Sequence, residues 1–255
     1  MSQPARRRKV VDNDGWTHIT STKKSSSLHH PPQPKDQLAP AEIPDGLTFE
    51  KLKDKYDRHK QQWMESHSWT VLKGLLEQEI ARVSGKIRNC VCFGLGSPSG
   101  FSRGGWVDRR SISMFQLAAL ELTVELLSQA KIINPDNLYA QDPVFNDMDK
   151  KLLKYAGFKV VQDPDAFAIV AKETFLYAPG AEKSHLIDLL LRDPVLFFGS
   201  TFDDIHSATT EGDTCAQFAG RRRSLLLPEF EPNPSAFWRT TLYWNGEAHL
   251  PPSAD

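Results

Sequence analysis

The sequence predicts an α/β fold of the Rossmann-like type, in which a parallel sheet of about five strands is flanked by helices and follows an N-terminal helical segment. After Gly85, short apolar runs alternate with helical stretches, which is typical of a parallel sheet covered on both faces. Glycine, proline or aspartate follows most of these runs, as expected where strands end in turns. With 40% hydrophobic residues over 255 positions, the chain can form one sizeable core.

The expected strands follow one another at the spacing of strand–helix units. Their bounds are residues 89–93, 138–141, 159–162, 174–178 and 195–198. Helices are expected over residues 113–130, from Asn146 or Asp147 to Ala156, after Asp163, and over residues 182–191. Because parallel crossovers are right-handed, the strand ends at residues 94–97, 142, 179 and 200 should meet at one edge. A ligand is expected at that edge.

The domain organisation is one tail and one domain. Residues 1–45 are rich in Ser, Pro and basic residues and bury too little surface to offset their ordering entropy, so they are predicted to be a disordered polar and basic tail. Residues 46–255 form the domain. It is divided into a helical lead-in, an α/β core, and a loop followed by a closing strand, at residues 48–84, 87–205 and 206–255. Within the last part, residues 206–224 are interpreted as a loop.

Composition narrows the classes of partner. The net charge of −1 gives no field that attracts the molecule to nucleic acid or to a membrane surface. Three cysteines argue against a disulfide framework, and no apolar stretch reaches the ~20 residues of a spanning helix. A cytoplasmic protein is therefore expected, without specific nucleic-acid or membrane binding. The basic run at residues 6–9 is either a nuclear-import signal or part of a solvated tail.

Cys90 and Cys92 lie two residues apart in an expected strand and should point to the same face of the sheet. We interpret them as small buried side chains, not as metal ligands or redox groups.

The glycine turn after the first strand is the sharpest local feature. Gly94, Gly96 and Ser97 follow the apolar run and let backbone N–H groups approach a ligand. The dinucleotide fingerprint is incomplete, since Ser99 stands where the third glycine would be, and the next helical pattern begins only near Ser113. Two interpretations stay open, ligand contact or a tight turn at the end of a strand.

Three further residues complete the candidate cofactor-binding set. Asp142 ends the second strand, where nucleotide-binding folds place a carboxylate on ribose hydroxyls, although an Asp-Pro turn also explains it. Pro179 ends the fourth strand at the same edge. Gln116 faces the glycine turn on a helical wheel, but the favoured alternative is a capping box with Ser113. No catalytic constellation or metal motif is recognised, and His185 is the histidine nearest this edge.

These residues resemble the Sensitivity to Red light Reduced family, whose members carry an SRR-type domain. The resemblance covers roughly residues 48–250. It rests on the segments at residues 91–97, 116–118, 142–145, 174–179 and 237–244, with residues 14–17 resembling the usual opening. It departs at Gly180 and Ala181, where the family tends to carry His-Cys. The resemblance implies a regulatory role in circadian and light signalling, microtubule-related processes or haem metabolism, with no agreed reaction.

Two hypotheses about function follow. The first is a regulatory protein that uses a Rossmann-like scaffold to bind a protein partner or a small ligand. The second is a methyltransferase dependent on S-adenosylmethionine, with the Gly94–Gly96 turn and Asp142 as its binding site. The residues suggest S-adenosylmethionine or a nucleotide as the cofactor, whereas haem is implied by the resemblance alone. Whether the protein is an enzyme stays open at this point.

Overall fold

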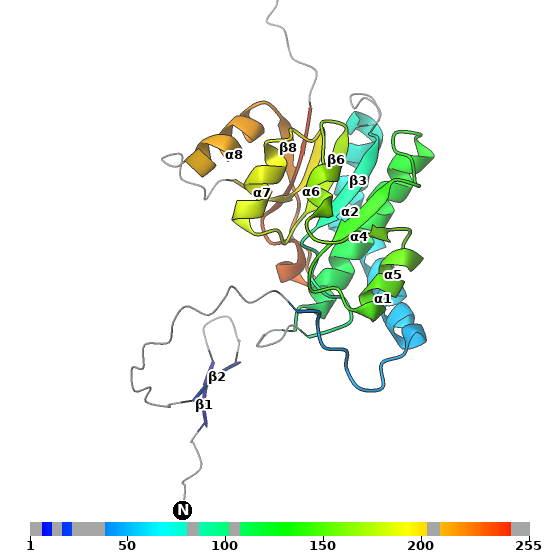
Figure 1. The fold of residues 1–255 in the computed structure, drawn as a ribbon, viewed down its shortest axis with the longest axis vertical. Coiled ribbons are helices and arrows are strands. Elements are labelled where there is room, and N and C mark those ends of the chain that lie inside the picture. The colour runs from blue at the N-terminus through cyan, green and yellow to red at the C-terminus, as the bar shows by residue number, and fades with distance from the viewer. Residues whose placement is uncertain are drawn as a thin grey trace, which may run out of the picture. The chain divides into compact units, whose positions relative to one another are not determined.

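The computed structural model describes residues 7–11, 17–21, 39–80, 87–101, 108–202 and 210–245. The chain divides into two units, residues 1–37 and 38–255 (Figure 1). The first unit contains an antiparallel pair of strands, β1 (Arg7–Val11) and β2 (Thr17–Ser21). This hairpin falls within the segment predicted to be a disordered tail, and residues 14–16 of the family's opening motif lie outside the described residues.

The second unit is built on one mixed sheet of seven strands. Their order is β5-β4-β3-β6-β7-β9-β8. The five strands from β5 to β7 are parallel, and β9 runs antiparallel between β7 and β8. The strand bounds are β3 Asn89–Phe93, β4 Leu138–Gln141, β5 Lys159–Val160, β6 Thr174–Ala178, β7 Leu196–Ser200, β8 Arg223–Leu226 and β9 Thr240–Trp244. The predicted α/β fold with five parallel strands is confirmed, and two more strands extend the sheet beyond β7.

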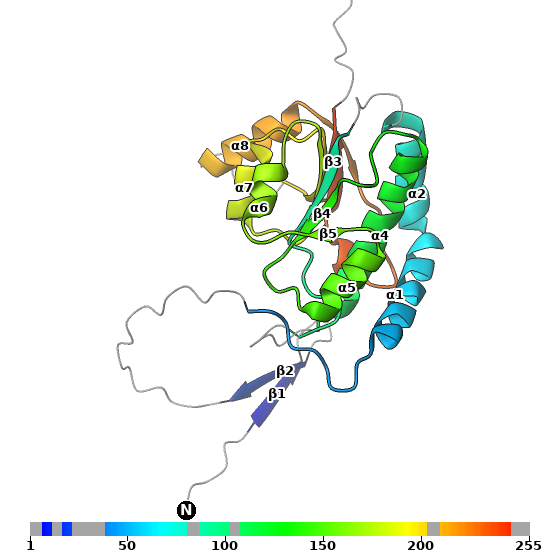
Figure 2. The ribbon, with the colours of Figure 1, turned by 45° about the vertical axis from the view of Figure 1, so that its right-hand side comes forward.

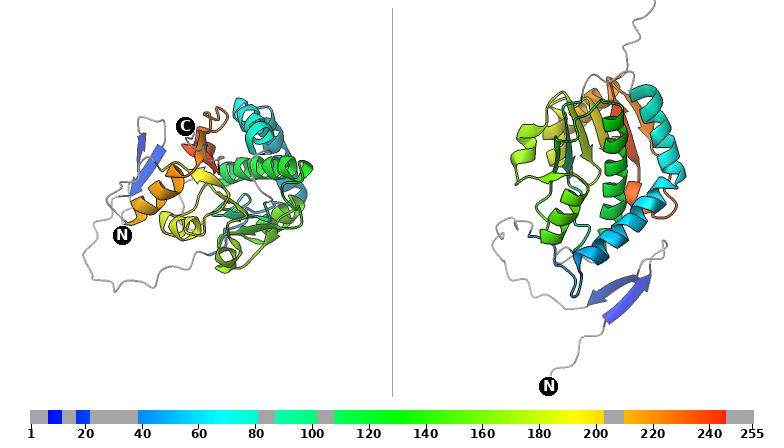
Figure 3. Two further views of the ribbon diagram at one scale, coloured as in Figure 1. Left: turned by 90° about the horizontal axis from the view of Figure 1, so that it is seen from above. Right: turned by 90° about the vertical axis from the view of Figure 1, so that its right-hand side faces the viewer.

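Helices cover both faces of the sheet. Figures 2 and 3 show α6, α7 and α8 on one face and α1, α2, α4 and α5 on the other. The helix bounds are α1 Phe49–Met64, α2 His67–Leu75, α4 Arg110–Gln129, α5 Asp147–Tyr155, α6 Asp165–Ile169, α7 Lys183–Leu190 and α8 Thr210–Gly220. A short π-helix, η1 (Leu76–Ile80), extends α2, and a 3₁₀ helix, η2 (Pro234–Phe237), precedes β9. Because both faces are covered, the central strands are apolar on both sides.

The alternation of side chains along β3 divides the core into two clusters. Cys90 and Cys92 pack on the side of α1 and α4, whereas Val91 and Phe93 pack on the side of α6 and α7. The interpretation of both cysteines as buried side chains is confirmed, since neither is exposed to solvent. Helix α4 is long and apolar enough to cross a membrane, but 67% of its most apolar window is buried within the protein.

The loop predicted over residues 206–224 is wrong for its described part. Residues 210–220 form α8 and residues 223–226 form β8. The apolar period was too weak to reveal this helix. Among its residues whose side chains the structure describes, Cys215 and Phe218 are buried in the second cluster and Ala219 is partly buried against it. Arg222 fixes the turn after α8, since its guanidinium donates to Asp193 Oδ1 at 2.8 Å and lies over the Phe218 ring. These are tertiary contacts that a local pattern does not carry.

Trp63 anchors α1 to the C-terminal part of the chain. Its ring is fully buried, and its centroid lies 5.1 Å from that of Phe230 and 4.4 Å from that of Phe237. Replacing Trp63 with alanine should lower the free energy of unfolding by about 3–5 kcal/mol through lost burial and a cavity. Denaturant unfolding measures this. The control is Met64→Ala at the neighbouring position, where the side chain is 42% exposed and the change should stay within about 0.5 kcal/mol. Equal losses in the two variants would contradict the account.

Candidate functional site

The glycine turn after β3 adopts the conformation that requires glycine. Gly94 and Gly96 have φ angles of +70° and +75°, a region that side chains with a Cβ rarely enter. Both residues are partly exposed. Residues with a Cβ are therefore disfavoured at both positions of the turn.

The turn after β3 touches the turn after β6. A Cβ placed on Gly94 would lie 2.9 Å from both the N and the Cα of Ala181, and a Cβ on Gly180 would meet the Gly94 carbonyl oxygen. The chain leaves β3 toward the face of α4 and leaves β6 toward the face of α7 (Figure 2). The contact thus lies where the chain switches from one side of the sheet to the other, which is where open α/β sheets bind ligands. Pro179 directly precedes this contact.

Asp142 joins the end of β4 to the glycine turn. Its Oδ2 accepts from the Gly96 N–H at 2.7 Å, and its Oδ1 accepts from the Val144 N–H at 3.0 Å. Burial raises the pKa of this carboxyl group, and the two backbone donors oppose the shift. The prediction that Gly96 and Asp142 meet at one edge is confirmed.

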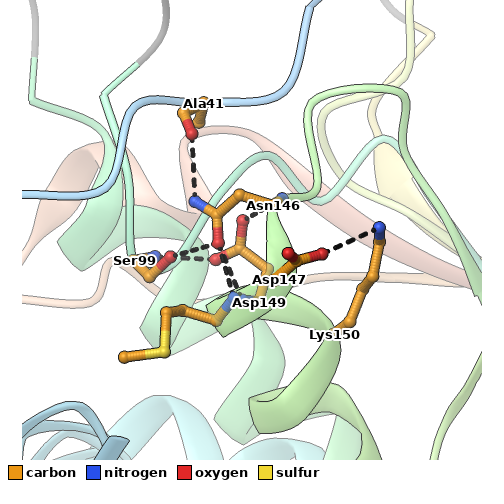
Figure 4. Close-up of polar contacts among 7 residues, drawn as sticks. Ala41, Ser99, Asn146, Asp147, Asp149 and Lys150 are labelled. Atoms are coloured by element: carbon orange, nitrogen blue, oxygen red, sulfur yellow. Dashed lines mark hydrogen bonds and ion pairs between the residues drawn. The ribbon is translucent and has the colours of Figure 1, made fainter. Parts of the chain in front are cut away.

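Ser97 faces away from this edge and into a buried network under the loop. Its hydroxyl donates to Asp149 Oδ2 at 2.6 Å and accepts from the Gly100 N–H at 2.8 Å. Asp149 Oδ1 also accepts from the Ser99 N–H at 2.9 Å, while Asn146 and Asp149 form the capping box of α5 (Figure 4). Burial raises the pKa of Asp149, although these bonds favour its ionised form.

An N-terminal segment lies over the same loops. The Asn146 Nδ2–H donates to the Ala41 carbonyl at 3.2 Å (Figure 4), and the Ala41 N–H donates to the Val144 carbonyl at 2.8 Å. Glu42 and Phe101 form an antiparallel bridge. The loops after β3 and β4 are therefore held from below by α5 and across their ends by residues 41–42.

Gln116 makes structural contacts within the core. Helix α4 begins at Arg110, so Ser113 is not its N-cap and the predicted capping box is wrong. The Gln116 side-chain Nε2–H donates to the Ala236 carbonyl at 2.8 Å, and the main-chain carbonyl of Gln116 accepts from the Tyr177 hydroxyl at 2.7 Å. These bonds tie α4 to η2 and β6.

Ser113 contacts the glycine turn instead. A Cβ on Gly96 would lie 2.9 Å from Ser113 Oγ, so the first turn of α4 packs directly on this glycine. In the sequence, a long segment stands between Gly96 and this helix. The structure brings the helix back to the turn, where the helix of a Rossmann-like unit begins.

Metal-ligating residues do not gather in the described part of the chain, where no group of three His, Cys, Asp or Glu could hold an ion. Burial raises the thiol pKa of Cys90 and Cys92 well above the ordinary value. His59 is half-buried against Phe115, and burial lowers its pKa. His67 is exposed.

Comparison with known proteins decides the family. A scan against protein families matches the SRR1 domain over residues 53–244. The chain belongs to the SRR1-domain family. The match runs from α1 to the last residue of β9, so the SRR1 domain includes the whole seven-stranded sheet and the edge described above. Searches of curated proteins and of solved structures found no significant match.

This SRR1 domain has Gly180 and Ala181 where the resemblance led us to expect His-Cys, and the space around Gly180 bears on this difference. A side chain at position 180 has no room beside the Gly94 carbonyl, so the two turns can touch in this way only with glycine at position 180. The His-Cys pair that the family tends to carry would need a different path of this loop.

Replacing Gly94 with valine should unfold or strongly destabilise the protein. The side chain would require a strained φ angle and would collide with the Ala181 backbone, which together cost about 2–4 kcal/mol. Thermal unfolding measures the loss. The control is Gly74→Val, because nothing lies within 4 Å of a Cβ there and valine has a slightly higher helix propensity than glycine. A Gly94→Val protein as stable as the control would show that the two turns do not touch.

Asp149 should matter far more than its neighbour Asp147. Asp149→Ala leaves buried donors of Ser97 and Ser99 without an acceptor and should cost about 2–4 kcal/mol. The side chain of Asp147 is 86% exposed and pairs only with Lys150 among the described residues, so Asp147→Ala should cost less than about 1 kcal/mol. Chemical denaturation of the two variants compares their free energies of unfolding. Similar losses would contradict the network.

The raised pKa of Asp149 predicts a pH dependence. Between its folded-state pKa and the ordinary value of 3.8, the folded protein holds more protons at this site than the unfolded chain, so this carboxyl adds stability as the pH falls through that window. Asp149→Asn removes this contribution. The difference in unfolding free energy between the unaltered protein and the variant should therefore grow in favour of the unaltered protein on acidification. If the unfolding free energies of the two proteins change in parallel with pH, Asp149 is not the source of this pH dependence.

Proposed function

We propose that this SRR1-domain protein is a regulatory protein that binds a nucleoside-containing small molecule at the carboxyl ends of β3 and β4. The observation that carries the proposal is the hydrogen bond from the Gly96 N–H to Asp142, because it brings a glycine turn and a carboxylate together at the switch point of the sheet. A nucleoside needs both, since its sugar must approach the main chain closely and its hydroxyl groups need an acceptor.

The residues present fit such a ligand. Gly94, Gly96 and Asp142 are each partly exposed. Each oxygen of Asp142 accepts one described hydrogen bond and, as a carboxylate oxygen, has a further lone pair for a ribose hydroxyl. The first turn of α4 lies against Gly96 and completes the wall on that side.

The strand order favours S-adenosylmethionine among such ligands. Numbered from β3 as the first, the strands lie in the order 3-2-1-4-5-7-6, and the seventh runs against the others. Rossmann-like methyltransferases share this arrangement. The likeness concerns the fold, so it supports a second candidate function, methyl transfer, without carrying it alone. When bound, S-adenosylmethionine supplies a methyl group on a positively charged sulfur, and the chain's own residues bind and orient it.

The described cysteines fit haem poorly. An axial ligand to haem iron is usually a histidine or a cysteine thiolate. Burial removes the described cysteines from solvent, and it raises the thiol pKa of Cys90 and Cys92, which disfavours a thiolate there. We therefore derive no step through haem.

The proposal extends to partners and location. We place the protein in the cytoplasm, with the nucleus as a second site, and expect a protein partner in place of a membrane or a specific nucleic acid. Three free and buried cysteines support a reducing compartment, and the net charge of −1 supports the choice of partner. Fractionation of cells and a pull-down with the full chain test these expectations.

A thermal-shift titration tests the ligand. S-adenosylmethionine, S-adenosylhomocysteine, NAD, ATP and haem are compared, and a ligand present at 100 times its Kd should stabilise the protein by about 2.7 kcal/mol. We expect the two S-adenosyl compounds to raise the melting temperature. No shift with either at millimolar concentration would end the methyltransferase hypothesis, and no shift with any nucleoside would end the binding proposal.

Asp142→Asn should separate binding from stability. The amide keeps one acceptor for a backbone N–H but loses the charge and the second acceptor, so affinity for an S-adenosyl ligand should fall about tenfold or more. Calorimetric titration measures the affinity. Asp147→Asn is the control, because this exposed carboxylate lies on α5 outside the proposed contacts. Unchanged affinity in Asp142→Asn would exclude the ribose contact.

A further inference from the structure

The strand order indicates where the ribose end and the opposite end of the proposed ligand lie. Asp142 follows β4, the glycine turn follows β3, and Pro179 follows β6, which are three neighbouring strands. Strands are about 4.8 Å apart, so a ligand that reaches from Asp142 across the turn toward β6 spans about 10 Å. With its ribose at Asp142, the ligand extends its other end toward the loop between β6 and α7.

His185 is the histidine that borders this end. It lies in the first turn of α7, four residues after Ala181, which touches Gly94. Its ring packs edge-on against Phe93, the residue before Gly94, with the ring centroids 5.8 Å apart. A second edge-on contact at 5.7 Å comes from Phe167 in α6. The imidazole is therefore held beside the carboxyl end of β3.

The exposure and the hydrogen bonding of His185 are unusual for a histidine that only packs against its neighbours. His185 is exposed even though two aromatic rings fix its orientation. No hydrogen bond joins its ring nitrogens to any other residue that the structure describes, whereas His59 bonds to both Lys55 and Ser111. An oriented imidazole with available nitrogens suits an O–H or N–H group of a bound molecule.

We infer that His185 faces the transferable methyl group and hydrogen-bonds to the molecule that receives it, which would bear an O–H or N–H nucleophile. This inference rests on the proposed binding of S-adenosylmethionine. It assigns the loop between β6 and α7 to the acceptor and the side of β4 to the nucleoside. It also gives the exposed imidazole a role that the cofactor site does not use.

The test compares two ligands that differ by one methyl group and one positive charge. The full chain is labelled with ¹³C at its histidines, and ring C–H resonances are recorded by NMR with saturating S-adenosylmethionine and then with saturating S-adenosylhomocysteine. His185→Gln assigns the resonance and, being an exposed change, should leave the fold intact. We expect the His185 signal to differ between the two complexes by about 0.1 ppm or more, because a charge at close range changes the field at the ring.

The control is His67, an exposed histidine at the start of α2 on the other face of the sheet, whose signal should coincide in the two complexes (Figure 2). If both ligands bind and the His185 resonance has the same chemical shift in the two complexes, the inference about His185 is wrong while the proposed function stands. If neither ligand binds in the thermal-shift titration, the proposed function fails and this inference falls with it.

Discussion

The hydrogen bond between the Gly96 N–H and Asp142 is the contact on which the proposed site depends. It joins the ends of two neighbouring parallel strands, and the approach of Gly94 to Ala181 joins the third. Both contacts need backbone without a Cβ, because the glycine φ angles are positive and the turns nearly touch. Three loops from distant parts of the chain therefore share one edge of the sheet.

The buried network around Asp149 holds this edge in place from beneath. Asp149 accepts bonds from the loop after β3 while it caps the helix after β4, so one carboxylate links both loops. Its charge is costly to bury, and the bonds to Ser97, Ser99 and Asn146 offset that cost. The site is thus supported by residues that do not themselves face it, which is how precise loop positions are usually achieved.

Much of the fold could be predicted because its signals are local. Apolar runs bounded by turns located β3, β4 and β6 to the residue, and the rule for parallel strands brought Gly96 and Asp142 together. Helix α8 and strand β8 were missed, because a few buried side chains and the contacts of Arg222 stabilise them. The roles of Gln116 and Asp149 also escaped prediction. Each depends on a partner far along the chain, although Asn146-x-x-Asp149 is a capping pattern that could have revealed one half of the network.

Amide hydrogen exchange on the full chain tests the central claim most directly, since it reports on the glycine turn and on Asp142 in one measurement. With saturating S-adenosylhomocysteine, peptides covering residues 94–101 and 139–145 should exchange more slowly together, because the ligand would contact both loops. Peptides from α2, which lies outside the proposed contacts, should be unaffected. Binding that leaves both loops unchanged, or that protects one without the other, would contradict a single site shared by Gly94, Gly96 and Asp142.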